Sequence, residues 1–472
     1  MADKIQLPPE APGSASESAG SVGAQKFGLP AAMALIVGSI IGVGIFNLPT
    51  SLAVYGPITL VSMALTTVGA LALALLFAAL SRRLPADGGP YAYARAAFGN
   101  PLGFANAWSY WITAWAGNAA IAVGWVLYVE HFINKDHTKW ITVLLVLAGL
   151  WIPAAVNLTG VKNIGSVQVV TTIVKFVALA FVAIVGLFYI KSANFTPWNV
   201  SKESAISAIG GGMAIALFSY LGVETAAVAA AKVRNPDRNI PRATILGTVA
   251  TAVVYMLSLI AVFGIVPTST LANATAPFSD AVNTMFGGTW AGNVMAVAVI
   301  ISGFGALNGW IMICAEMPLA AADDGLFPAN FKRISKRGVP AYGIIASTVL
   351  ASVAMGINYI GSGGANVFTT LVLMTGITSA IPYGFSALAQ LKWRWADHKE
   401  MQTPRFLRDM IVAVLSLVFS ILFIWYSRNT GHSFWAYWAP FFLAGGALAL
   451  GIPVYLAQRR HLTPPAPVPP YR

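Results

Sequence analysis

Long apolar runs alternate with short polar segments along most of the chain, between residues 29 and 457. A helix needs about 20 predominantly apolar residues to cross a bilayer, and about twelve runs reach that length. The pattern therefore predicts an all-α polytopic membrane protein with about twelve transmembrane helices, because a helix satisfies its own backbone groups in lipid. The predicted spans cover residues 29–55, 57–81, 102–129, 139–158, 167–190, 206–231, 243–267, 292–321, 341–359, 367–391, 410–427 and 434–457. A short extra helix is expected within 272–291.

Glycines interrupt two of these runs. The first predicted span contains Gly38-Ser39-Ile40-Ile41-Gly42-Val43-Gly44, and the sixth contains Ser219-Tyr220-Leu221-Gly222-Val223. Each glycine costs a helix roughly 1 kcal/mol relative to alanine, and loosened backbone in lipid must be buried in protein or line a watery cavity. The stretches align at one fixed offset, which pairs Gly42 with Gly222. Interrupted segments at matching places in two halves of a membrane protein indicate the binding site of a transporter.

The two interruptions offer complementary chemistry. Unwinding at Gly42–Gly44 exposes backbone amides at the start of a half-helix, where the helix dipole favours an anion such as a carboxylate. Unwinding at Gly222 exposes carbonyls at the end of a half-helix, which favour a cation such as an α-ammonium group. An amino acid carries both groups and is the predicted substrate class. Two flexible hinges that bind no ligand are the alternative, which the matched placement makes less favourable.

Composition excludes a soluble domain. Of the 472 residues, 57% are hydrophobic and only 9% are charged, against about 25% charged residues in soluble proteins. The single cysteine, Cys314, excludes an internal disulfide framework and a cysteine-based metal cluster. A net charge of +12 could suit nucleic acid, but the basic residues fall in loops between apolar runs, as a membrane topology signal does. We therefore expect no nucleic-acid partner.

Loop charges predict the orientation of the chain in its membrane. One set of alternate loops carries 17 basic residues, and the opposite loops carry five, so the first set and both termini should face the cytoplasm. The first and sixth spans then start at opposite faces, which predicts a five-plus-five inverted repeat with helices 1 and 6 broken. The predicted parts are a disordered cytoplasmic tail, a transporter domain and a Pro-rich cytoplasmic tail, at 1–27, 28–458 and 459–472. Within the domain, the two repeats and helices 11–12 occupy about 28–190, 206–392 and 410–457.

Three charged residues lie clearly within predicted spans, away from their ends: Lys175, Glu224 and Glu316. Charges at membrane depth are costly and indicate function by default, so we assign these residues to coupling or gating. The alternatives are a protonated Glu224 bonded to a neighbouring helix and a Lys175 that snorkels to the interface. Glu316 lies two residues before Pro318, which frees backbone carbonyls, so a structural role is supported equally there.

A family resemblance rests on stretches from span 1 to the end of span 8. They are Gly42-Val43-Gly44-Ile45-Phe46 with Leu48-Pro49, Gly88-Gly89-Pro90-Tyr91-Ala92-Tyr93-Ala94-Arg95, Tyr110-Trp111, Gly117-Asn118, Gly222-Val223-Glu224, Asn235-Pro236-Asp237-Arg238-Asn239-Ile240-Pro241, Gly309-Trp310 and Ala321-Ala322-Asp323-Asp324-Gly325-Leu326-Phe327-Pro328. The chain resembles the amino acid–polyamine–organocation (APC) transporter superfamily, and within it the bacterial basic amino acid/polyamine antiporter group that includes arginine–agmatine antiporters. The resemblance implies the same inverted repeat and a substrate held between spans 1, 3, 6, 8 and 10. A homodimer is compatible with it.

The resemblance also implies roles for individual residues. Tyr110 matches a gate partner, Glu224 a carboxylate linked to gating and proton coupling, and Lys175 the lysine that replaces sodium in sodium-independent permeases. Val43 and Phe218 depart from the antiporters, which have Ser and Trp there. The expected substrate-binding residues are Ser39, Ile41, Gly42, Val43, Gly44, Tyr110, Ala114, Asn118, Phe218, Leu221, Gly222, Trp310 and Thr375.

Together these observations predict a sodium-independent amino acid permease that works by alternating access, as an exchanger or proton-coupled carrier of cationic amino acids or their amine products. A proton-coupled symporter of neutral amino acids is the alternative, followed by a channel or a transporter-like sensor. An enzyme is not expected, because the five histidines are scattered and show no metal-ligand spacing. We expect no cofactor and no metal. The individual substrate, the coupling mode, the direction of transport, the oligomeric state and the role of Glu316 stay open from sequence.

Overall fold

The computed structural model describes residues 28–160, 164–228, 233–361, 364–399, 402–428, 433–460, 462–465 and 468. Within these ranges the chain forms helices and no β-strand. Eleven helices are long and apolar enough to span a membrane, and a shorter apolar helical stretch covers Ala205–Tyr220. The prediction of an all-α polytopic membrane protein with about twelve helices is therefore confirmed. The predicted tail at 1–27 lies outside the described residues, as does part of the tail at 459–472.

Both spans that contain the predicted interruptions are broken. The first consists of α1 (Leu29–Ile40) and α2 (Gly44–Ala53), with three non-helical residues between them. The sixth consists of α8 (Ala205–Leu217), the 3₁₀ turn η3 (Phe218–Tyr220) and α9 (Thr225–Val228).

The other long spans are continuous helices, except the last one, which turns at Leu450 between two helices. Several begin with proline in the first turn, as at Pro236 and Pro404, where the missing N–H has no helical partner in any case. Their bounds are α3 (Thr59–Arg83), α5 (Asn100–Glu130), α6 (Lys139–Leu158), α7 (Ile164–Val185), α10 (Pro236–Ile265), α13 (Trp290–Asp323), α14 (Ala341–Gly361), α15 (Gly364–Ala396), α16 (Thr403–Tyr426), α17 (Phe434–Ala449) and α18 (Gly451–Gln458).

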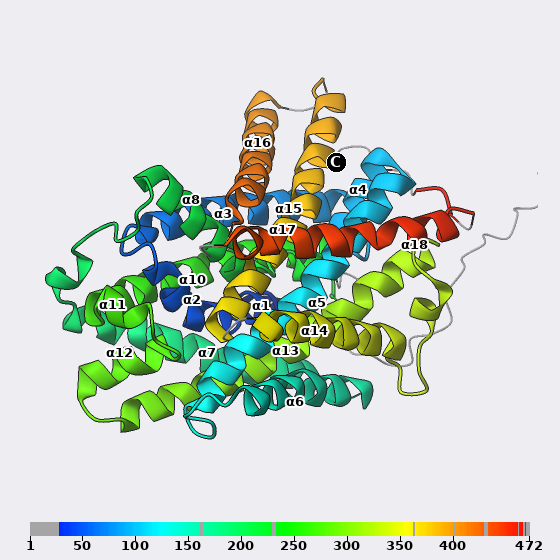
Figure 1. Ribbon diagram of the computed structural model, residues 1–472. Helices are drawn as coiled ribbons and strands as arrows, with labels where there is room; N and C mark the ends of the chain where they lie inside the picture. The colour runs from blue at the N-terminus through cyan, green and yellow to red at the C-terminus, as the bar shows by residue number, and fades with distance from the viewer. Residues whose placement is uncertain are drawn as a thin grey trace, which may run out of the picture.

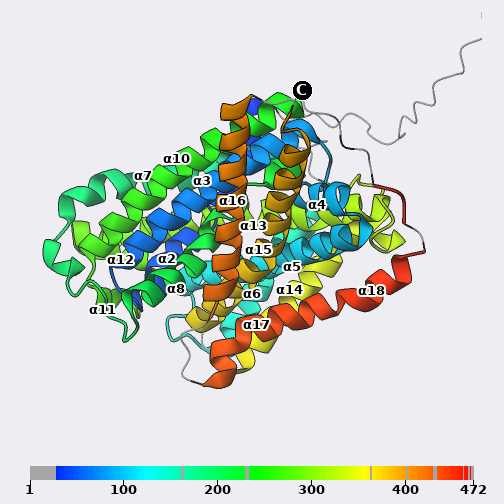
Figure 2. The same ribbon diagram turned by 90° about the horizontal axis from the view of Figure 1, so that it is seen from above.

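Short helices lie at opposite ends of the bundle. The helices α11 (Thr268–Leu271) and α12 (Pro277–Phe286) lie at one end, and α4 (Pro90–Phe98) lies at the other (Figures 1 and 2). The extra helix expected within 272–291 is confirmed as α12. The helix α4 was not anticipated, because it is short and follows a Gly-Gly turn rather than an apolar run. The amide of Gly88, in the turn before α4, donates to the carbonyl of Val228, 3.1 Å away, which ties this turn to α9.

The surface of the bundle carries the apolar side chains that a bilayer requires. Helices α6, α14, α16 and α17 are buried least along their apolar windows, whereas α5 and α15 are enclosed by the rest of the protein. In both views α17 and α18 follow the outside of the bundle (Figures 1 and 2). Large exposed apolar residues occur on many of the long helices, as at Val68, Leu144, Val253, Val294, Val353 and Ile421. Such broad apolar surfaces are expected to face lipid.

A segment near the C-terminus returns to the end of the bundle that carries α4. The Arg95 guanidinium donates to the Thr463 carbonyl at 2.8 Å and forms an ion pair with Asp324, with 2.6 Å between Nη1 and Oδ2. The Thr463 hydroxyl donates to the Asp324 backbone carbonyl at 3.0 Å. One threonine therefore joins α4 to the end of α13.

Candidate functional site

The end of α1 leaves three successive backbone carbonyls without regular helical partners. Gly42 N–H, which would bond Gly38 in a continued helix, instead donates to Ile40, 2.8 Å away. Side chains from three other helices supply donors, because buried carbonyls need partners. The Lys175 ammonium of α7 donates to the Gly38 carbonyl at 2.6 Å, the Trp310 indole of α13 to Ser39 at 3.1 Å, and the Tyr255 hydroxyl of α10 to Ile40 at 2.8 Å.

The start of α2 presents the opposite groups. The Val43 carbonyl accepts from the amides of Phe46 and Asn47, at 3.1 and 3.3 Å. The amides of Val43, Gly44 and Ile45 make no hydrogen bond to any described residue. Free amides at a helix N-terminus, together with the positive end of its dipole, form a site for an anion.

The second break contacts the first directly. Gly222 has φ of +113°, in a region that L side chains rarely adopt. A Cβ atom at Gly222 would lie 2.9 Å from the backbone carbon of Ser39, and one at Gly44 would lie 2.8 Å from the Phe218 ring. The two glycine-interrupted segments, which are far apart in sequence, therefore meet at the centre of the bundle.

This contact gives a direct test of the break. Gly222→Ala should abolish most transport and destabilise the fold by about 1–3 kcal/mol, because the new Cβ meets both a disfavoured φ and the backbone of α1. Transport rates in liposomes and thermal unfolding in detergent measure the two effects. Gly356→Ala is the matched control, since a Cβ there meets nothing within 4 Å. Wild-type transport in the Gly222 variant would show that the break tolerates ordinary backbone.

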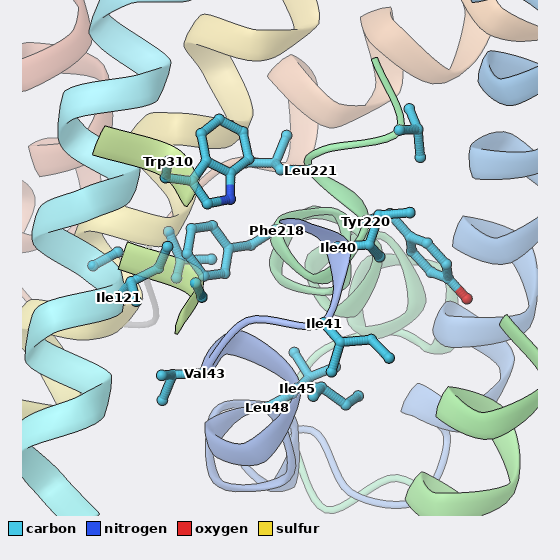
Figure 3. Packing of buried hydrophobic residues seen from close by; sticks show 14 of the residues in the cluster. Ile40, Ile41, Val43, Ile45, Leu48, Ile121, Phe218, Tyr220, Leu221 and Trp310 are labelled. Carbon is cyan, nitrogen blue, oxygen red and sulfur yellow. The ribbon is translucent and has the colours of Figure 1, made fainter. Parts of the chain in front are cut away.

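A cavity of about 20 Å³ lies between the two breaks. That volume holds about one water molecule, so an amino acid can enter only when neighbouring side chains move. Figure 3 shows Phe218 beside the end of α1, with Trp310 and Leu221 on one side of it and Ile121 on another. The lining residues are Ser39, Ile40, Gly42, Gly44, Thr113, Gly117, Ile121, Phe218, Leu221 and Trp310.

The cavity includes some of the residues expected from sequence and leaves out others. Six of the expected binding residues line it: Ser39, Gly42, Gly44, Phe218, Leu221 and Trp310. Ile41 and Ala114 are buried outside the lining, and Val43 lies against Gly303 of α13. Gly222 lies against Ser39 at the end of α1 and does not line the cavity. The lining also contains Thr113 and Ile121, which carried no signal in the sequence, and Ile40 and Gly117, which belong to stretches noted there but were not expected to bind substrate.

The Glu224 carboxylate does not line the cavity and is held by two tyrosine hydroxyls. Tyr110 donates to its Oε1 at 2.7 Å and Tyr383 to its Oε2 at 2.8 Å, and all three side chains are buried. These two hydrogen bonds form a clamp on Glu224, which connects the sixth span to α5 and α15. Sequence reasoning found Glu224 and Tyr110 but missed Tyr383, because a tyrosine inside a span is ordinarily a packing residue.

Three further predicted residues lie in different surroundings. The Asn118 amide donates to the Cys314 sulfur at 3.2 Å, and the Thr375 hydroxyl donates to the Val372 carbonyl at 2.7 Å. Neither side chain lines the small cavity. Glu316 is half-buried and lines a separate, open cavity of about 320 Å³ near α4 and the end of α13, together with Asp324.

The hydroxyl of Tyr91 on α4 forms part of the wall of this second cavity. It donates to the Asp324 carboxylate and to the Ala320 carbonyl. Burial, followed by the nearby Asp324 charge, raises the pKa of Tyr91 well above its ordinary value. The hydroxyl therefore keeps its proton and remains a donor.

Comparison with known proteins gives one family for nearly the whole chain. A model of the amino acid permease family matches residues 27–447. The putrescine transporter PotE of Haemophilus influenzae is 31% identical over 402 residues, which cover 85% of this chain and 92% of that protein. An arginine/ornithine antiporter of Pseudomonas aeruginosa is 30% identical, with coverage of 84% and 85%. A cadaverine/lysine antiporter of Escherichia coli is 27% identical, with coverage of 84% and 89%.

Proposed function

Since this chain belongs to the amino acid permease family, we propose that it is a sodium-independent exchanger of cationic amino acids and their amine products. The observation that carries the proposal is the contact between two broken helices around one small cavity. Relatives that span most of the chain are named as transporters of putrescine, arginine, ornithine, cadaverine or lysine. Those names support a cationic substrate for this chain.

The proposed binding mode follows from the groups at the cavity. When the substrate is an amino acid, the free amides at the start of α2 would hold its carboxylate. No charged side chain is among the lining residues of the described chain. The cationic end would therefore rest on backbone carbonyls and on the faces of Phe218 and Trp310, which attract cations through their ring quadrupoles. Phe218 closes the site by contact with Gly44, and its movement would open it.

The proposal assigns sodium independence to Lys175. Its buried amino group donates to the Gly38 carbonyl at the C-terminal end of α1, where its protonated form would supply a positive charge. A cation is favourable there because carbonyl dipoles converge at a helix C-terminus. Because the Lys175 side chain already occupies the site at the C-terminal end of α1, a bound metal cation is not required to stabilise that end.

The proposed setting is a bacterial inner membrane with both termini in the cytoplasm. The excess of basic residues in one set of loops supports this orientation, and the relatives named above are bacterial. The two halves of the chain would rock against each other as inverted repeats, with Glu224 and its tyrosines linking substrate binding to gating and to protons. Glu316 would act at the larger cavity, as part of the passage to the cytoplasm.

Counterflow tests the proposal. Purified protein in sodium-free liposomes loaded with unlabelled lysine, arginine, ornithine, putrescine or cadaverine should accumulate the labelled form of at least one of them, about tenfold above empty liposomes. Neutral amino acids serve as the comparison set. Uptake that strictly requires sodium would contradict the role of Lys175. Uptake of neutral amino acids alone, driven by a proton gradient, would replace the proposal with the symporter alternative.

A further inference from the structure

Gln168 on α7 is a buried amide that the proposed mechanism does not yet use. Its side chain is 5% exposed, and neither its oxygen nor its nitrogen has a hydrogen-bond partner among the described residues. An unpaired buried polar group costs about 1–3 kcal/mol. Such an unpaired amide is explained if it gains a hydrogen-bond partner in another conformation of the protein.

Two glycines make room for this amide. A Cβ atom at Gly38 would lie 2.3 Å from the Gln168 nitrogen, and a Cβ atom at Gly309 would lie 3.3 Å from its oxygen. The glycine on α1 therefore cannot become alanine unless Gln168 moves. The amide lies in a fitted space between α1, α7 and α13.

The same space lies directly behind the cavity. Gly38 and Gly309 precede Ser39 and Trp310, which both line the cavity. The hydrogen bond from the Trp310 indole to the Ser39 carbonyl, at 3.1 Å, closes the cavity on this side. If Trp310 and Ser39 part, the Gln168 amide, beside Gly38 and Gly309, becomes available to a departing substrate.

The position of Gln168 in α7 also indicates on which side of the cavity it lies. It lies early in α7, two turns before Lys175 on the same helical face, because residues at i and i+7 align. Both α1 and α7 begin on the cytoplasmic side in the proposed orientation. Gln168 is therefore on the cytoplasmic side of the cavity.

We propose that Gln168 is a substrate-binding residue of the cytoplasmic passage, whose amide oxygen accepts a hydrogen bond from the ammonium end of the substrate after the Trp310–Ser39 contact opens. This inference rests on the proposed transport of cationic substrates. A neutral amide suits the step, because it binds an ammonium group without the strong charge pairing that would retain it. The contact replaces water around the ammonium while the substrate passes between α1, α7 and α13.

The test compares Gln168→Met with wild type in right-side-out and inside-out membrane vesicles, using the substrate that counterflow identifies. Methionine keeps the length of the side chain and removes its hydrogen-bonding groups. We expect the KM on the cytoplasmic face to rise about tenfold and the KM on the outer face to stay within about twofold of wild type. Thermal stability should be unchanged or higher, because an unpaired buried amide is removed.

Thr248→Val is the matched control. The Thr248 hydroxyl is also fully buried and has no hydrogen-bond partner among the described residues, but it lies on α10 and does not line the cavity. It should leave both KM values unchanged. Unchanged KM values in Gln168→Met, or an equal rise on both faces, would overturn the inference. Absence of any cationic exchange by the wild-type protein would instead refute the proposed function, which the counterflow assay detects without any variant.

Discussion

Glu224→Gln is expected to lower the exchange rate by at least about tenfold, or about 1.4 kcal/mol of transition-state free energy, while the fold is retained. The glutamine oxygen can accept from Tyr110, and its amide can donate to the Tyr383 oxygen, so both contacts of the carboxylate keep a counterpart. The substitution therefore removes the exchangeable proton and charge with little change in packing. Counterflow rates at several pH values, with thermal unfolding as the check on folding, measure the effect.

A second variant distinguishes the contribution of the Glu224 carboxylate from that of its tyrosine hydrogen bonds. Tyr383→Phe keeps the Glu224 carboxyl and removes one donor, so we expect a smaller loss, about threefold. If Glu224→Gln instead transports at the wild-type rate with an unchanged pH profile, Glu224 is a structural residue that joins the sixth span to α5 and α15.

Lys175→Met should reduce exchange by about tenfold or more and also lower thermal stability. The substitution leaves the Gly38 carbonyl without its donor at the broken end of α1, and a charge-assisted hydrogen bond contributes about 1.5–3 kcal/mol. Methionine fills much of the same volume, so the loss reports the ammonium group rather than a cavity. Counterflow in sodium-free and sodium-containing buffer, together with the unfolding temperature, measures both effects.

Tyr255→Phe is the comparison for Lys175. It removes a neutral donor from the Ile40 carbonyl, two residues further along the same broken end. We expect a loss of about twofold, since a neutral hydrogen bond contributes about half as much as a charge-assisted one. Equal losses in the two variants would mean that the charge of Lys175 has no special role.

Sequence patterns predicted the membrane-crossing parts of the helices more closely than their ends. The seventh span was expected from residue 243, whereas α10 begins at Pro236. Similarly, α15 continues to Ala396, beyond the expected end at residue 391. Hydropathy marks the part of a helix that lies in lipid, and the polar turns beyond the bilayer keep their backbone hydrogen bonds without changing the apolar pattern.

The candidate site divides in a similar way. The glycine breaks, Lys175 and Glu224 could be identified locally, because glycines and charges are unusual within an apolar span. Their partners could not, since the Gly38 carbonyl and the Tyr383 hydroxyl reach them across helices that are distant in sequence. Gln168 was missed for the same reason. An uncharged amide near the start of a span is ordinary until its neighbours are known.

The contact between Arg95 and Thr463 has a consequence for biosynthesis. The two residues are 368 positions apart, and translation at about 5–20 residues per second separates them by roughly 20–70 s. Throughout that interval α4 is already made, while the threonine that joins it to Asp324 has not left the ribosome. The Nη2 group of Arg95 must therefore keep water or another provisional partner during insertion, and this end of the bundle reaches its final structure only after synthesis is nearly complete.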